Sequence, residues 1–210
     1  KDPDLQEADI LSYAAGHKAL GLYAMSALRN EIAKAFRPAL LAPETRQLRL
    51  EDLLGFRKSP AAGTKLVKQF SSKALDGHPG PLVPFVRLST GASGIGLGSS
   101  IGLGLAAACS YKENTPKVNI IEGEGGLTAG RSAEALAIAA AAGLDNVILH
   151  LDWNQASIDS DKVTADKESR GDYTAWTPAE LCYINGFNVI EVADGFDFEQ
   201  VYAAQKFAYD

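Results

Sequence analysis

The sequence has few cysteines, and its first residues are acidic and polar. Its 210 residues contain only Cys109 and Cys182, which form no CxxC pair and to which we assign no role. So few cysteines argue against a disulfide framework and are typical of a reducing cytoplasm, which is the expected location. The opening residues KDPDLQEAD are acidic and polar, so we expect no secretory signal.

The sequence also lacks an excess of positive charge. Its formal net charge is −6 and its pI is about 5.1, so we do not expect it to bind nucleic acid. The one long uncharged run, residues 91–110, raises the question of a membrane span. Six glycines between Gly91 and Gly104 instead favour a loop that enters a tightly packed helix, so we expect no membrane partner.

A hydrophobic content of 46% is enough for one sizeable core, and we interpret residues 1–210 as a single domain. Predicted strands alternate with predicted helices, a pattern typical of an α/β fold with a Rossmann-like parallel sheet and flanking helices. The expected strands are 9–13, 117–121, 146–152 and 187–192. The expected helices are 18–36, a glycine-rich one ending at 111, 132–142, 178–184 and 196–209. Residues 37–75 are expected to be an irregular connection with a short helical piece at 50–56.

Two oxygen-bearing side chains follow neighbouring strands of this predicted sheet. Glu124 lies between two glycines directly after one strand, and Asn154 follows the next strand. Neighbouring strands lie about 4.8 Å apart, so both side chains could converge on one hard cation with oxygen ligands at about 2.1 Å. Gly125 would let the backbone approach a phosphate closely. The alternative is an exposed loop acid and an asparagine that caps a turn.

The segment GEGGLTAGRSAEALAIAAAAGLDNVILHLDWN, residues 123–154, resembles the thiamine diphosphate motif in its transketolase version. That motif usually reads GDG, with an asparagine about thirty residues later. Four more blocks follow the order of the cofactor half of the transketolase family: SYAAGHKALGLYA (12–24), DGHPG (76–80), STGASGIGLGSSIGLGLA (89–106) and DWNQASID (152–159). Residues 30–75 match only loosely.

The resemblance implies a thiamin diphosphate-binding fold that holds thiamine diphosphate with Mg²⁺ or Ca²⁺. It implies that the cofactor contacts are His17, Gly91, Ser93, Gly125 and Asn154, and that the metal ligands are Glu124, Asn154 and the backbone carbonyl of Ala156. It also implies that His78 faces the hydroxyl and carbonyl oxygens of the substrate, a task that suits a group able to carry a proton near neutral pH. Where transketolases usually have Asp, Glu124 adds one methylene group and keeps an anionic oxygen.

The activity that the resemblance implies is ketol transfer, in which a two-carbon fragment moves between sugar phosphates. We expect the chain to be the diphosphate-anchoring domain, incomplete at both ends and inactive alone, because no pyrimidine-binding domain is found in it. The expected partners are sugar phosphates and a pyrimidine-binding domain or subunit, in a homodimer or heterotetramer. Two alternatives stay open: a decarboxylating or 1-deoxyxylulose-phosphate synthase-type thiamine enzyme, and a catalytically silent scaffold subunit.

A dehydrogenase is a weaker alternative. Residues 90–96 nearly reproduce the TGxxxGIG phosphate loop of short-chain dehydrogenases, and Tyr202 with Lys206 supplies a YxxxK pair. The loop has one residue too few between its glycines and lies mid-chain rather than after the first strand. The chain also stops four residues after Lys206.

Overall fold

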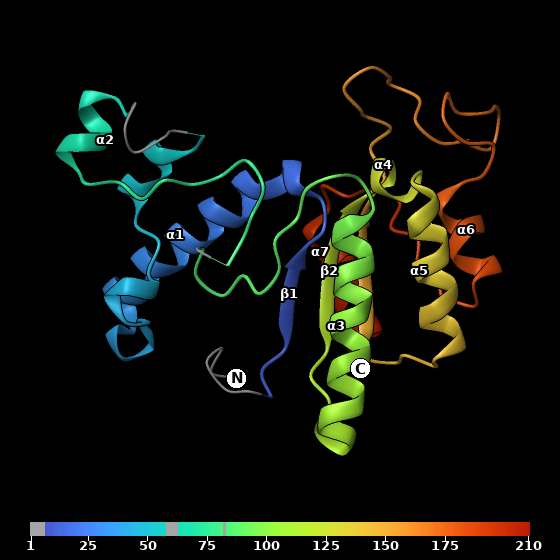
Figure 1. Cartoon of the computed structure of the whole chain (residues 1–210), viewed down its shortest axis with the longest axis horizontal. Coiled ribbons are helices and arrows are strands. Elements are labelled where there is room, and N and C mark those ends of the chain that lie inside the picture. Colours follow the sequence, from blue (N-terminus) through green and yellow to red (C-terminus); the bar gives the residue numbers. More distant parts are fainter. Residues whose placement is uncertain (1–6, 58–62, 82) are drawn as a thin grey trace. The chain divides into compact units, whose positions relative to one another are not determined.

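The computed structural model describes residues 7–57, 63–81 and 83–210, which form two compact units. The first unit contains residues 7–14 and 92–210, and the second contains the described residues between 15 and 91. Figure 1 labels the helices and strands and colours them by their position in the sequence.

The first unit contains a parallel sheet of three strands, in the order β1-β2-β3. They are β1 (Ile10–Tyr13), β2 (Val118–Gly123) and β3 (Val147–Asp152). Val118 of β2 lies opposite Ile10 of β1 and opposite Val147 of β3. The carboxyl ends of β2 and β3 therefore meet at one edge, and the predicted parallel α/β fold is confirmed.

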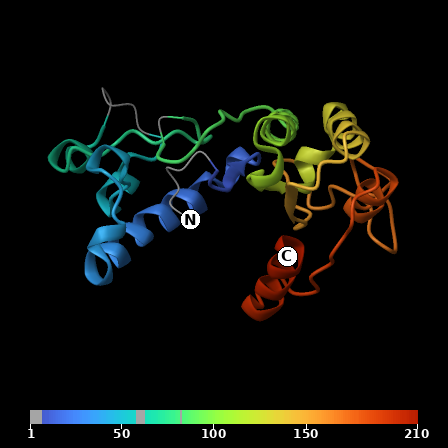
Figure 2. The same cartoon turned by 90° about the horizontal axis from the view of Figure 1, so that it is seen from below.

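Helices cover both faces of this sheet. On one face lie α3 (Ile95–Tyr111) and α5 (Gly130–Ala141), and Figure 2 shows α7 (Phe198–Tyr209) on the opposite face. Two shorter helices are α4 (Glu124–Leu127) and α6 (Pro178–Ile184). The buried core joins the strands to α3, α4, α5 and α6 through Ile10, Ala14, Leu97, Ile101, Val118, Ile120, Leu127, Ala135, Leu136, Ala139 and Leu181.

Helix α3 packs directly on the sheet because its glycines carry no side chain. A Cβ atom at Gly96 would lie 2.5 Å from the Cα atom of Ala14, just past the end of β1. A Cβ atom at Gly104 would lie 2.5 Å from Cγ2 of Val147 in β3. The uncharged glycine-rich run is thus a helix of the core, as expected. Within the described ranges, no helix is long and apolar enough to cross a membrane.

The last helix is tied to the amino end of the sheet. Asp197 caps the start of α7 by accepting the backbone N–H groups of Glu199 and Gln200 at 2.9 and 3.2 Å. At its end, the Tyr209 hydroxyl donates to Asp9, and the Lys117 ammonium lies 4.4 Å from the centre of the Tyr209 ring. These contacts join α7 to residues that precede β1 and β2.

The prediction of a strand at residues 187–192 is wrong, because the structure has no helix or strand there. Phe187 packs against the core cluster, whereas Ile190 is substantially exposed. Apolar residues alternate in this segment because one side of it is partly buried. A segment can be buried on one side without pairing with a neighbouring strand. Helix α4 was not predicted, since its four residues are too few to show a helical period.

The second unit is built around α1 (Ala19–Phe36), which follows a 3₁₀ turn at Gly16–Lys18. It also contains α2 (Lys65–Gln69) and 3₁₀ turns at Pro38–Leu40, Glu44–Arg46 and Leu50–Gly55. The irregular connection expected at 37–75 therefore contains several short helical pieces, of which the one at Leu50–Gly55 was predicted.

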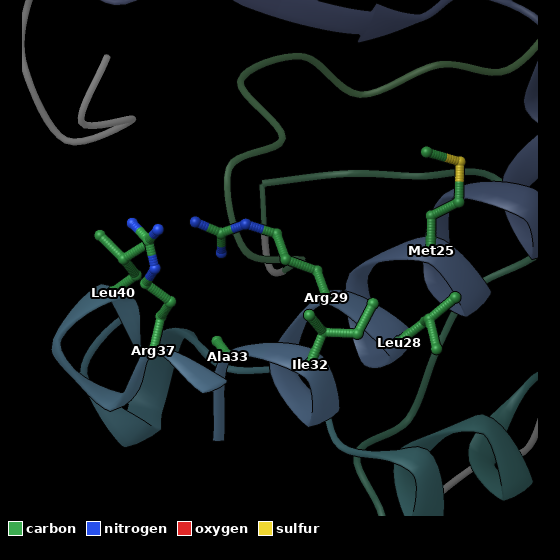
Figure 3. Close-up of a pocket in the computed structure, with 7 residues that line it drawn as sticks. All are labelled: Met25, Leu28, Arg29, Ile32, Ala33, Arg37 and Leu40. Atoms are coloured by element: carbon green, nitrogen blue, oxygen red, sulfur yellow. The ribbon is translucent and has the colours of Figure 1, made fainter. Parts of the chain in front are cut away.

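Most of the apolar stripe of α1 is exposed. Leu22 is buried, but the side chains of Met25, Leu28 and Ile32 are 66%, 56% and 52% exposed. They border an open groove of about 320 Å³, shown in Figure 3, to which Arg29 and Arg37 also contribute. The buried face of α1 instead carries Ala19, Leu22, Tyr23, Ala27, Asn30 and Ala33. Small residues on that face allow close packing within the second unit.

A buried aspartate holds two distant parts of the second unit together. Asp52 is fully buried and accepts the Arg49 guanidinium at 2.8 Å and the backbone N–H of Lys73 at 2.9 Å. Burial alone would raise the pKa of Asp52, but the hydrogen bonds from Arg49 and from the Arg49 and Lys73 backbone outweigh it, and the pKa is lowered. The carboxylate is therefore stabilised in its ionised form.

We expect Asp52→Asn to destabilise the second unit by about 2 kcal/mol, because an amide cannot accept all of these hydrogen bonds. Since the folded-state pKa lies below that of the unfolded chain, ionised Asp52 stabilises the fold above about pH 4. This contribution is lost as pH falls through the folded-state pKa. Urea unfolding across about pH 3–7, with hydrogen exchange at the Lys73 amide, checks both effects. Equal stability of the two proteins at neutral pH would contradict the expectation.

Candidate functional site

The register of β2 and β3 brings the two predicted oxygen ligands to the same edge of the sheet. Gly123 lies directly opposite Asp152, so Glu124 and the residues after Asp152 emerge side by side. The Glu124 carboxylate accepts the backbone N–H of Asn154 at 3.3 Å. Two residues that are thirty positions apart in sequence are therefore in direct contact.

Glu124 carries an oxygen without a protein partner. Its side chain is only 1% exposed, and its Oε1 atom is buried with no hydrogen-bond partner among the described residues. A buried carboxylate oxygen without a partner is unfavourable unless a cation or a donor approaches it. This oxygen is therefore suited to be a ligand of a cation at the carboxyl edge of the sheet.

The Asn154 side chain caps a turn. Its Nδ2 donates to the Asp152 carboxylate at 2.9 Å, and its Oδ1 accepts the backbone N–H of Ala156 at 2.9 Å. Gln155 between them adopts a left-handed backbone with φ of 59°. The amide oxygen thus accepts the Ala156 N–H, as in the turn-capping alternative, and its second lone pair can still bind a metal.

No group of three His, Cys, Asp or Glu side chains able to hold a metal ion occurs in the part of the chain that the structure describes. A cation at Glu124 would need further ligands of another kind, such as amide or backbone carbonyl oxygens and oxygens of a ligand. Asn154 and Ala156 supply oxygens of these kinds on the neighbouring turn.

The turn that carries Glu124 is held rigidly but leaves open space beside it. Thr128 Oγ1 donates to the Gly125 carbonyl at 2.8 Å, and Ser132 Oγ donates to the Gly126 carbonyl at 2.6 Å. A Cβ atom built on Gly125 would meet nothing within 4 Å. Another molecule can therefore approach the backbone at Gly125.

Ser93 lies at the start of α3, next to a glycine that has a structural role. Gly94 has a φ of 80°, and a Cβ atom there would lie 2.6 Å from the Ser132 hydroxyl oxygen. This close approach brings the starts of α3 and α5 together, with Ser93 exposed beside them.

Sequence reasoning missed the support under Asn154. Gln155 exchanges two hydrogen bonds with the backbone of Thr164, at 2.9 and 3.0 Å, and Trp153 Nε1 donates to the Thr164 hydroxyl at 2.9 Å. Thr164 is fully buried. The two residues that flank Asn154 thus anchor its turn to a later loop, and no local sequence pattern indicates this long-range contact.

The two histidines assigned to cofactor and substrate lie together in the second unit. The ring centres of His17 and His78 are 5.6 Å apart. The His78 ring rests on Gly16, where an added Cβ atom would lie 2.0 Å from its Cδ2 atom. Gly91, which also belongs to this unit, is exposed.

His150 has a structural environment. Its Nε2 lies 3.0 Å from the Asn119 amide oxygen on the neighbouring strand, and burial lowers the pKa of the imidazole. A neutral histidine paired across the sheet agrees with the interpretation that His150 is not part of the site.

We expect Gly16→Ala to displace the His78 ring, because the new methyl group overlaps its Cδ2 atom. The shift should appear as changed His78 imidazole resonances in ¹H–¹⁵N spectra. Gly21→Ala is the matched control, since a Cβ atom there meets nothing within 4 Å. It should leave His78 unchanged and stabilise α1 by about 1 kcal/mol. Identical His78 spectra for Gly16→Ala and the original protein would contradict the packing.

Comparison with known proteins identifies the family of this chain. Residues 46–209 match the family model "Transketolase, thiamine diphosphate binding domain". A transketolase of Physarum polycephalum is 28% identical over 98% of this chain and 27% of its own length. The structure of transketolase from Leishmania mexicana superposes with a TM-score of 0.72 at 25% identity, covering 99% of this chain and 27% of that chain.

A relative from Actinobacillus succinogenes, named as one subunit of an apulose-4-phosphate transketolase, is 38% identical over 43% of this chain and 32% of its own length. The chain thus spans about a quarter to a third of the proteins compared. Because the match to the family model covers most of the sequence and the parallel fold agrees with it, the chain belongs to the transketolase family.

Proposed function

We propose that this chain anchors the diphosphate of thiamine diphosphate through a divalent cation, Mg²⁺ or Ca²⁺, at the carboxyl edge of its sheet. The observation that carries the proposal is the buried, unpartnered Oε1 of Glu124 beside the Asn154 turn. Membership of the transketolase family supports the identity of the cofactor.

The metal ligands in this proposal are the Glu124 carboxylate, the Asn154 amide oxygen and the Ala156 carbonyl. Asn154 binds through the second lone pair of its amide oxygen, which also accepts the Ala156 N–H, and Glu124 keeps its second oxygen on the Asn154 backbone. Open space at Gly125 gives a phosphate oxygen room beside the backbone. Gly91 and Ser93 are the further cofactor contacts in this proposal, on the strength of the family resemblance.

Thiamine diphosphate supplies, when bound, the carbon nucleophile on which ketol chemistry depends. The histidines of the second unit carry the remaining roles. His17 donates a hydrogen bond to the diphosphate. His78 hydrogen-bonds the hydroxyl and carbonyl oxygens of the substrate and holds or releases a proton there, since an imidazole can do both near neutral pH. Gly16 keeps the His78 ring in place for this task.

The activity we propose is transketolase-like transfer of a two-carbon unit between sugar phosphates, in complex with a pyrimidine-binding domain or subunit. The name of the Actinobacillus relative supports both parts, because it combines a sugar phosphate with a subunit designation. A homodimer or heterotetramer would build the site between the two kinds of domain.

A silent scaffold is the second candidate, and one observation favours it. The Asn154 amide oxygen already has a hydrogen-bond partner in the Ala156 N–H, so the turn is closed without a cation. A scaffold would keep the turn-capping arrangement and leave Glu124 without a cation.

We expect calorimetric titration of thiamine diphosphate to show saturable binding that requires Mg²⁺ and is reversed by EDTA. Glu124→Gln removes the anionic ligand and should weaken binding by roughly 30-fold or more, since losing a buried charge partner costs about 2 kcal/mol or more. The matched control is Glu113→Gln, which removes an exposed carboxylate before β2 and should leave the affinity unchanged.

Binding that ignores Mg²⁺ and EDTA would overturn the metal proposal, and no binding would favour the scaffold. With a pyrimidine-domain partner, turnover of a ketose phosphate with an aldose phosphate acceptor supports ketol transfer. Turnover of pyruvate instead would assign the decarboxylating or 1-deoxyxylulose-phosphate synthase-type reaction.

A further inference from the structure

A second buried carboxylate lies two residues before Glu124. Glu122 is on β2, and its side chain is 3% exposed. It lies on the same face of β2 as Val118 and Ile120, whose side chains lie in the core. A carboxylate in a row of core positions is costly to bury, so its contacts should explain why an acid is present.

Glu122 binds the turn that starts α4. Its Oε1 accepts the backbone N–H of Gly123 at 2.9 Å, one residue before Glu124. A Cβ atom at Gly126 would lie 2.4 Å from the Cδ atom of Glu122 and 2.5 and 2.6 Å from its two oxygens. The carboxylate of Glu122 therefore occupies the space in which a side chain at position 126 would begin.

The contact with Glu122, and not the backbone conformation, explains why position 126 is a glycine. It lies inside α4, and its φ is not in the left-handed region that favours glycine. Glycine within a helix costs about 1 kcal/mol relative to alanine, so its presence calls for a compensating reason. The carboxylate of Glu122 provides that reason, since any larger residue would collide with it.

Three side-chain hydrogen bonds thus hold the turn around Glu124. Glu122 binds the N–H of Gly123, Thr128 binds the carbonyl of Gly125, and Ser132 binds the carbonyl of Gly126. These contacts fix the backbone on both sides of Glu124 and leave its own carboxylate as the group that faces the Asn154 turn.

We propose that Glu122 is a positioning residue: it packs over Gly126 and holds the Gly123 N–H, so that Glu124 presents its carboxylate to the cation. This inference rests on the proposed function. An apolar residue could fill the same space, but it could not accept the N–H of Gly123. The role therefore depends on the acceptor oxygen and on the fit to Gly126.

The test measures Mn²⁺ affinity by electron paramagnetic resonance in the presence of saturating thiamine diphosphate. Glu122→Leu fills the space without an acceptor and should weaken Mn²⁺ binding roughly tenfold, the equivalent of one hydrogen bond of about 1.4 kcal/mol. Glu122→Gln keeps an acceptor oxygen and should stay within about threefold of the original affinity. Glu113→Gln again serves as the control for loss of a carboxylate.

A second pair of variants tests the fit to Gly126. Gly126→Ala should weaken Mn²⁺ binding roughly tenfold or more while Glu122 is present, because the methyl group displaces the carboxylate. The double variant Glu122→Ala with Gly126→Ala should lose no more affinity than Glu122→Ala alone, because the methyl group then has no carboxylate to displace. Independent losses of stability would instead add up, and circular dichroism of each variant confirms that it is folded.

The outcomes separate this inference from the function on which it rests. If the original protein binds no Mn²⁺, the proposed cation site fails and the role of Glu122 fails with it. If the original protein binds Mn²⁺ and Glu122→Leu binds it equally well, the cation site stands and the role of Glu122 is overturned. Additive losses in the double variant would likewise overturn the fit to Gly126.

Discussion

The parallel pairing of β2 with β3 is the constraint on which the site depends. Its register sets Gly123 opposite Asp152, and only this register places Glu124 against the backbone of Asn154. A shift of one residue would also reverse the faces of β3 and move its core side chains into solvent. Helix α3 packs closely on one face of the sheet at Gly96 and Gly104. Packing in the core therefore fixes the strands whose ends carry the site.

Two buried carboxylates at this edge have different surroundings. Glu122 is directed into the protein, where it fits over Gly126 and accepts the N–H of Gly123. Glu124 uses one oxygen for the Asn154 backbone and keeps the other buried without a protein partner. Glu122 therefore shapes the turn from within, whereas Glu124 faces the neighbouring loop, where we propose that the cation binds.

Much of the first unit could be predicted from the sequence, because its core strands are apolar runs and Asp197 is a strong helix cap. The meeting of Glu124 and Asn154 followed from the same reasoning, since parallel strands end at one edge. The turn-capping side chain of Asn154 and its support by Thr164 could not be predicted, because they depend on contacts between distant loops. The apolar side chains of α1 are largely exposed, and residues 187–192 form no strand. Apolar periodicity can therefore indicate a helix or an extended segment, but it does not tell which other element packs against it.

The most direct test of the cation site is the crystal structure of the chain with thiamine diphosphate and Mn²⁺, using the anomalous scattering of manganese to locate the ion. We expect a manganese peak at about 2.1–2.2 Å from Oε1 of Glu124, with the Asn154 amide oxygen also bound to the ion. A manganese ion bound elsewhere, or cofactor density with no ion beside Glu124, would contradict it.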